Sequence, residues 1–237
     1  TTGLTLNLSD DADVIRDAAQ ATIDAATGIA VNDAETVTYS VAQADTLLGR
    51  LTDTTDLTLN LADDANVIRD AAQSTIDAAT GNSIALVAGE SLSYNIADAG
   101  TLLGRLTDTS NLTLEVSDTK EAIDAEISNG VGATTVLGQA DSIVTDTGSL
   151  DLTVAEASAI GAKLTNGYSI IDAASAIISE ADANNPSTVL DNAIQVIGNF
   201  QGDTLSIQQK LDFDSQFNGF GTGYAIADTK TNILDGL

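Results

Sequence analysis

The chain has 237 residues, of which 43% are hydrophobic, and carries 35 acidic against 8 basic residues, a formal net charge of −27. This balance argues against nucleic acid as a partner, because binding phosphates requires a basic surface. The sequence contains no Cys and no His, which excludes disulfides, thiol chemistry, Ser-His-Asp catalysis and His-based zinc sites.

The chain repeats itself. Residues 4–28 and 57–81 differ at only three of 25 positions, which are Ser9/Ala62, Asp13/Asn66 and Ala21/Ser74. The phrase TLLGRLTDT also occurs twice, at 46–54 and 101–109. Fixed-period similarity predicts a stacked array in which each unit buries its apolar face against its neighbours. A repeat supplies the same residues at regular intervals, whereas a catalytic centre needs different residues at one point, so the repeat favours a scaffold.

The first module begins with alternating apolar residues. Leu4, Leu6 and Leu8 alternate with polar residues, which predicts a half-buried strand. An Asp-rich turn follows, and Ser9 or Asp10 suits the start of a helix. Apolar residues from Ile15 to Ala26 then fall on one helical face, and Gly28 ends the element. We therefore predict a module of strand, Asp-rich turn and one helix.

A second kind of module follows the first. Val37, Tyr39 and Val41 alternate with polar residues, which predicts a strand, and residues 43–51 predict a short helix. A copy occupies residues 92–106. The two kinds recur with decaying similarity and a pair period of about 55 residues. Later copies lie at 112–127, 150–164, 168–178, 204–217 and 224–234.

One strand per module, with helices between the strands, predicts an α/β repeat protein with solenoid-like stacking of the modules. The alternative is a single irregular α/β domain. We expect residues 1–182 to form the array. Residues 183–237 contain all four Phe and the only Pro, and we expect them to form a degenerate terminal repeat or cap. No apolar run approaches the ~20 residues of a membrane span, so we expect no transmembrane segment.

Three phrases resemble a repeat of very large extracellular proteins from cyanobacteria and proteobacteria. They are LDLTVAEASAIGAKL at 150–164, YSIIDAASAII at 168–178 and YAIADTKTNIL at 224–234. Such repeats occur in giant adhesins and surface-layer-like proteins, often beside haemolysin-type calcium repeats. The resemblance implies a secreted or cell-surface location in bacteria and a structural or adhesive role. The calcium nonapeptide itself is absent, since GFGTGYAIAD at 219–228 does not fit it.

The Asp-rich turns are the best candidate binding sites. Three oxygen-bearing side chains within four residues can contribute to the 6–8 oxygens that Ca²⁺ takes. Helix capping uses the same residue types at the same place, so both interpretations stay open. Apart from this calcium, we predict no cofactor and no catalytic residue. The candidate ligands are Asp10, Asp11, Asp13, Asp63, Asp64, Asn66 and Asp118.

Together these features predict a non-enzymatic extracellular structural protein. We expect it to self-assemble or to extend as part of a surface layer, sheath, filament or giant adhesin, with calcium as counter-charge. The expected partners are further copies joined head to tail, or neighbouring repeats of a longer chain. The alternative is an adhesin module that binds a glycan or another surface.

Overall fold

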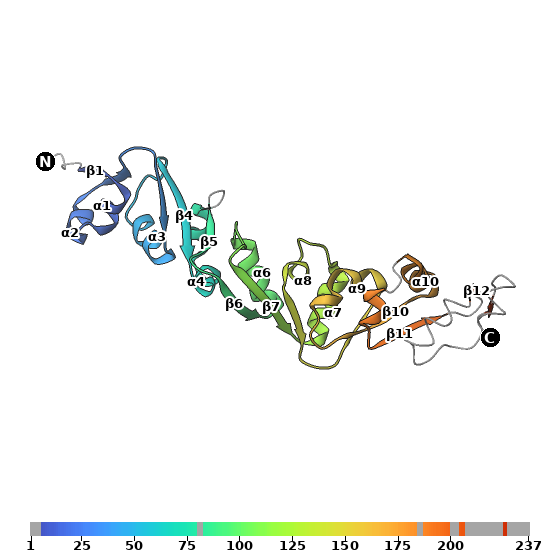
Figure 1. Cartoon of the computed structure of the whole chain (residues 1–237). Helices are drawn as coiled ribbons and strands as arrows, with labels where there is room; N and C mark the ends of the chain where they lie inside the picture. The colour runs from blue at the N-terminus through green and yellow to red at the C-terminus, as the bar shows by residue number, and fades with distance from the viewer. Residues whose placement is uncertain (1–5, 80–82, 184–186, 200–203, 207–224, 227–237) are drawn as a thin grey trace. The chain divides into compact units, whose positions relative to one another are not determined.

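The structure is a computed structural model that describes residues 6–79, 83–183, 187–199, 204–206 and 225–226. The chain divides into two compact units, one formed by residues 1–92 and 97–113 and the other by residues 93–96 and 114–237. Figure 1 shows the elements in chain order. The four Phe, Pro186 and all but residues 225–226 of the phrase at 224–234 lie outside the described residues, so the terminal cap at 183–237 stays a prediction.

The described strands form five separate small parallel sheets. The first three sheets are β1 (Asn7–Asp10) with β2 (Gly28–Val31); β3 (Glu35–Tyr39), β4 (Leu57–Asp63) and β5 (Ile84–Leu86); and β6 (Glu90–Tyr94), β7 (Leu112–Asp118) and β8 (Ser142–Thr145). The other two are β9 (Leu150–Leu152), β10 (Tyr168–Ala173) and β11 (Gln195–Asn199); and β12 (Thr204–Leu205) with β13 (Ala225–Ile226).

Short helices connect the strands. After the strands of the first kind of module come α1 (Ala12–Asp17), α2 (Gln20–Ala25), α4 (Ala65–Asp70), α5 (Gln73–Ala79), α7 (Lys120–Asn129), α8 (Val136–Gln139), α10 (Ala174–Ala183) and α11 (Thr188–Asp191). After the strands of the second kind come α3 (Val41–Leu48), α6 (Ile96–Arg105) and α9 (Val154–Ile160), the last continued by the 3₁₀ turn η1 (Gly161–Lys163). None of the described helices is both long and apolar enough to cross a bilayer.

The predicted solenoid is wrong, because the strands do not join one continuous stack. Pairing runs in parallel from β3 to β4 to β5 and then stops, and a new sheet begins with β6. The alternative of a single domain also differs from the structure, which has two units. The fold is therefore a mixed α/β arrangement of separate parallel sheets.

A threonine side chain binds the backbone of the last strand in three of the sheets. The Thr52 hydroxyl accepts a hydrogen bond from the Ile29 amide at 2.8 Å and donates to the Ile29 carbonyl at 3.1 Å. Thr107 makes the same two bonds to Ile84 on β5. Thr165 donates to the Ile143 carbonyl on β8. The same segments also pair with these strands at single points, since Ala30 forms an isolated parallel bridge with Asp53 and Ile143 with Leu164. The edge groups of these strands are thus satisfied by a turn and not by a full strand.

The predicted single helix of the first module is also wrong. Residues 12–25 form two helices, because Ala18 and Ala19 are extended, with ψ angles of 148° and 137°. The second copy breaks in the same way at Ala71, which has a ψ of 150°. This break frees carbonyl groups that an α-helix would otherwise pair with its own amides.

Both units bury small aliphatic residues at repeated positions. The first helix after each strand of the first kind holds one isoleucine with 0% exposure, and these are Ile15, Ile68, Ile123 and Ile177. The strands contribute Leu59 and Leu61, while α3 contributes Leu47. Figure 1 shows β3 and β4 side by side, and α3 packs on β4. The core positions therefore follow the repeat.

Candidate functional site: carboxylates at the strand ends

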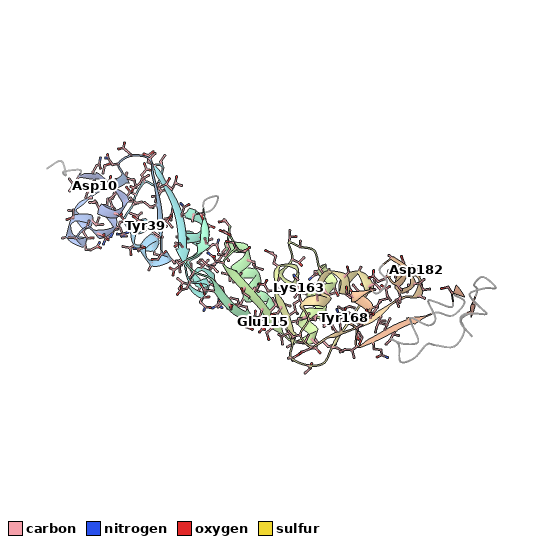
Figure 2. All side chains as sticks on the ribbon, in the orientation of Figure 1. Asp10, Tyr39, Glu115, Lys163, Tyr168 and Asp182 are labelled. Carbon is pink, nitrogen blue, oxygen red and sulfur yellow. The ribbon has the colours of Figure 1, made fainter. Side chains whose placement is uncertain are left out.

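The predicted carboxylates lie where strands of the first kind end. Asp10 ends β1, Asp63 ends β4 and Asp118 ends β7, while Asp172, which the sequence analysis did not single out, lies near the end of β10. In each, Oδ1 accepts a hydrogen bond from the amide of the following residue, at 2.7–2.9 Å. Figure 2 labels Asp10. One oxygen of each carboxylate is therefore occupied locally.

The second oxygen reaches a helix that lies earlier in the chain. Oδ2 of Asp63 accepts from the Val41 amide at 2.9 Å, and Val41 is the first residue of α3. Oδ2 of Asp118 accepts in the same way from Ile96 at 3.0 Å. Oδ2 of Asp172 accepts from Val154, the first residue of α9, at 2.9 Å. These carboxylates therefore cap helices that begin 18–22 residues before them.

A second set of carboxylates caps the helices that follow strands of the first kind. Glu35 accepts from the Ala12 amide at 2.8 Å, Glu90 from Ala65 at 3.0 Å and Asp146 from Lys120 at 3.0 Å. Each donor is the first residue of its helix. The local N-cap residues Asp11 and Asp64 make no side-chain capping bond. For α1 and α4, side-chain capping thus comes from the next module and not from the preceding Asp, which the sequence pattern had indicated, whereas α7 is also capped by its preceding residue Thr119.

Asp13 belongs to a different cluster. Its Oδ1 accepts hydrogen bonds from Arg16 Nη1 at 2.6 Å and from the Tyr39 hydroxyl at 2.7 Å. The Arg16 guanidinium carbon also lies 4.8 Å from the centre of the Tyr39 ring, close enough for a cation–π contact. Burial, followed by the hydrogen bond to Asp13, raises the pKa of Tyr39. Asp17, on the other side of Arg16, has its pKa lowered by the hydrogen bond from that arginine.

The predicted calcium ligands do not converge on one point. Asp11, Asp64 and Asn66 are exposed, while Asp10, Asp63 and Asp118 bond to backbone amides. Within the ranges that the structure describes, no group of three or more Asp, Glu, His or Cys side chains is arranged to hold a metal ion. Calcium binding at these seven residues stays a prediction.

Three basic side chains bind carbonyl groups at or near the C-terminal ends of helices. Arg50 Nη1 donates to the carbonyls of Ile15 and Ala18, both at 2.8 Å. Arg105 Nη1 makes the equivalent bonds to Ile68 and Ala71, at 2.7 and 2.9 Å. These are the carbonyls freed where the predicted single helix breaks. Lys163, labelled in Figure 2, donates to the Gly138 carbonyl in α8 at 2.6 Å.

An open groove lies between α9 and α10. Its lining consists mainly of small residues, with two acidic side chains, Asp172 and Glu180. Asp172 binds two amides, and Glu180 accepts a hydrogen bond from the Ser187 hydroxyl at 2.6 Å. Both acids are thus engaged in holding the backbone and the turn after α10. The groove offers no pairing of a nucleophile with a base.

Sequence reasoning missed the cross-module carboxylates at 35, 90, 146 and 172. A signal was present for two of them, because Glu35 and Glu90 each begin an alternating strand at matching places in the repeat. A comparison with known protein families finds no match, and a comparison with curated protein sequences finds none either. The functional proposal therefore rests on the arrangement of charged groups.

Proposed function

We propose that the chain is a non-enzymatic structural segment of an extracellular bacterial protein, such as a surface layer, sheath, filament or giant adhesin. The observation that carries the proposal is the use of carboxylates to cap helices of the preceding module. Six such bonds connect carboxylates to first-residue amides at 12, 41, 65, 96, 120 and 154. Charged side chains that in an enzyme would face a substrate here hold successive modules together.

The surface chemistry supports the same role. The chain keeps a formal net charge of −27 and has no Cys or His. High net charge keeps a concentrated protein soluble and disfavours nonspecific association. Calcium is the counter-ion that we assign to exposed carboxylates such as Asp11 and Asp64. It would act between neighbouring surfaces, because the carboxylates of one turn do not converge.

The proposal predicts where the protein is found and in what form. An antibody raised against the full chain should label the outer surface of the source cells in immunogold microscopy. Immunoblots of surface extracts should show the antigen in species much larger than 24.1 kDa, either as assemblies or as a longer polypeptide. A small cytosolic species alone would contradict the proposal.

The calcium assignment has a separate test. Thermal melts of the purified chain in CaCl₂ and in EDTA, with MgCl₂ as control, measure any stabilisation by the ion. We expect a higher melting temperature in CaCl₂ than in MgCl₂. Identical melting curves would remove calcium and leave the structural role in place.

A further inference from the structure

We propose that the outer edge of β1, with Leu6, Leu8 and Asp10, is a docking surface for a strand–helix segment of the same kind as residues 35–48. The inference deepens the proposed function by naming the surface through which the chain joins its neighbour, and in assigning that purpose it rests on the proposed function. Residues 4–28 and 57–81 are nearly identical in sequence but have different surroundings.

The twin leucines of the repeat differ in burial. Leu6 is 40% exposed, whereas Leu59, its counterpart 53 residues later, is 1% exposed. Leu8 is half-buried, whereas its counterpart Leu61 is 1% exposed. The sequence around the two pairs is nearly the same, with Ser9 in place of Ala62 beside them, so the difference in burial comes from what covers each pair. Leaving large apolar side chains in water is unfavourable, so a segment that covers Leu6 and Leu8 gains hydrophobic free energy.

The structure shows what covers the second pair. Strand β3 pairs in parallel with β4, opposing Val37 to Leu59 and Tyr39 to Leu61, and α3 packs on β4. Strand β1 pairs with β2 on one side, and no strand among the described residues pairs with its other side. An open strand edge of this kind accepts a further strand through its backbone amides and carbonyls.

The carboxylates of the two copies differ in the same way. Asp63 uses Oδ1 for the Asp64 amide and Oδ2 for the Val41 amide at the start of α3. Asp10 uses Oδ1 for the Asp11 amide, at 2.9 Å. The position equivalent to Val41 is the first residue of a helix that would follow a strand docked on β1. The Asp10 carboxylate is thus placed to receive the N-terminus of an incoming helix.

These features define the chemistry of the partner segment. It needs a short alternating strand, then a Ser or Thr cap with Gln or Glu three residues later, as in Ser40 with Gln43 and Thr153 with Glu156. An apolar first helical residue should follow the cap, as Val41 follows Ser40. A second copy of this chain is disfavoured, because its strands β3 and β9 are already paired with β4 and β10. The net charge of −27 also opposes self-association.

The first test titrates the purified full chain with a fluorescent peptide of residues 33–51, using a scrambled peptide as control. We expect saturable binding of one peptide per chain, and no binding of the scrambled peptide. Asp10→Asn, which keeps an acceptor for the Asp11 amide, should weaken binding about tenfold or more, because a charge-assisted hydrogen bond is lost. Leu6→Asn should weaken it as well.

The chain offers a matched control for these variants. Val14 is 50% exposed, and its counterpart Val67 remains 40% exposed although that copy is covered. Val14 therefore lies outside the surface that the strand–helix segment covers. Val14→Asn should leave peptide binding unchanged. If Val14→Asn weakens binding as much as Leu6→Asn, the peptide binds elsewhere and the proposal is overturned.

The deciding test removes the entropy cost of ordering a free peptide. A second copy of residues 32–56 is fused directly before Leu4. The added Asp56 then precedes Leu4 in the same way as the native Asp56 precedes Leu57, the counterpart of Leu4. Hydrogen exchange should then slow at residues 7–10 in the extended chain, and Asp10→Asn should reverse part of this protection. If hydrogen exchange at residues 7–10 is unchanged in the extended chain, the proposal is overturned. It is also overturned if protection of these residues in the unextended chain rises with the concentration of that chain, since a second copy would then be the occupant. Surface labelling of cells is independent of these results, so failure of the docking surface is distinguishable from failure of the proposed function.

Discussion

The Arg50 guanidinium donates a hydrogen bond to the carbonyl oxygen of Ile15, 35 residues earlier, across 2.8 Å. The same Nη1 atom also reaches the Ala18 carbonyl. Arg105 repeats both bonds in the next copy, to Ile68 and Ala71. A cation at the C-terminus of a helix is favourable because the partial charge of the exposed carbonyls is negative there. The arginine therefore stabilises the break between α1 and α2 and ties two modules together.

Replacing Arg50 by Met should destabilise the protein. The half-buried guanidinium satisfies two carbonyls, and hydrogen bonds to a charged group contribute about 1.5–3 kcal/mol each. We expect a loss of at least about 2 kcal/mol in the free energy of unfolding, measured by urea denaturation. Lys120→Met is the control, because among the described residues its side chain forms only an i,i+4 ion pair with the partly exposed Asp124 and surface ion pairs contribute little. Equal losses in the two variants would count against the capping role of Arg50.

Thr52 should control the exchange of one backbone amide. Its hydroxyl accepts from the Ile29 amide, so Thr52→Val leaves that amide without its partner while keeping the shape of the side chain. We expect the Ile29 amide to exchange about tenfold faster in Thr52→Val, as measured by NMR. Thr52→Ser keeps the hydroxyl and should preserve slow exchange. Fast exchange in the serine variant as well would show that the hydroxyl is not what protects Ile29.

Alkaline pH should destabilise the fold through Tyr39. Burial, together with the hydrogen bond to Asp13, raises the pKa of Tyr39, so the folded state holds the phenolic proton after the unfolded chain has lost it. The resulting stability is present below about pH 10, the ordinary pKa of Tyr, and is lost as pH rises from there through the folded pKa. Burial also raises the pKa of Tyr168, so two tyrosines contribute in the same direction.

The measurement for this prediction is urea denaturation at several pH values between 8 and 11. The wild type should lose stability above about pH 10, and Tyr39→Phe should show a shallower decline because it has no proton to lose. A Tyr39→Phe curve parallel to that of the wild type would contradict the role assigned to the phenol.

The local elements could be predicted from the sequence, whereas the bonds between modules could not. Alternation of Leu57, Leu59 and Leu61 predicts the strand that became β4, because each residue of a strand faces the side opposite its neighbour. The break at Ala18 has no local signal, since the sequence from Ile15 to Ala26 fits one helix. It depends on Arg50, which lies far along the chain and binds the freed carbonyls only in the folded state.

The candidate site shows the same limit. The residue types at 10, 63 and 118 fit calcium and capping equally well, because both need carboxylate oxygens at a helix start. Only the folded structure places Oδ2 of Asp63 beside the Val41 amide, 22 residues away. The bonds of Thr52 to Ile29 and of Thr107 to Ile84 likewise could not be predicted, because in sequence these threonines resemble ordinary turn residues.

The most direct measurement of the central claim compares Asp63→Asn with Asp10→Asn. Each variant keeps an acceptor for the following amide, but only Asp63 also accepts from the first amide of a helix in the preceding module. In urea denaturation we predict that Asp63→Asn lowers the free energy of unfolding by about 1–3 kcal/mol and that Asp10→Asn lowers it by less than about 0.5 kcal/mol. Equal losses in the two variants would contradict the claim that these carboxylates hold successive modules together.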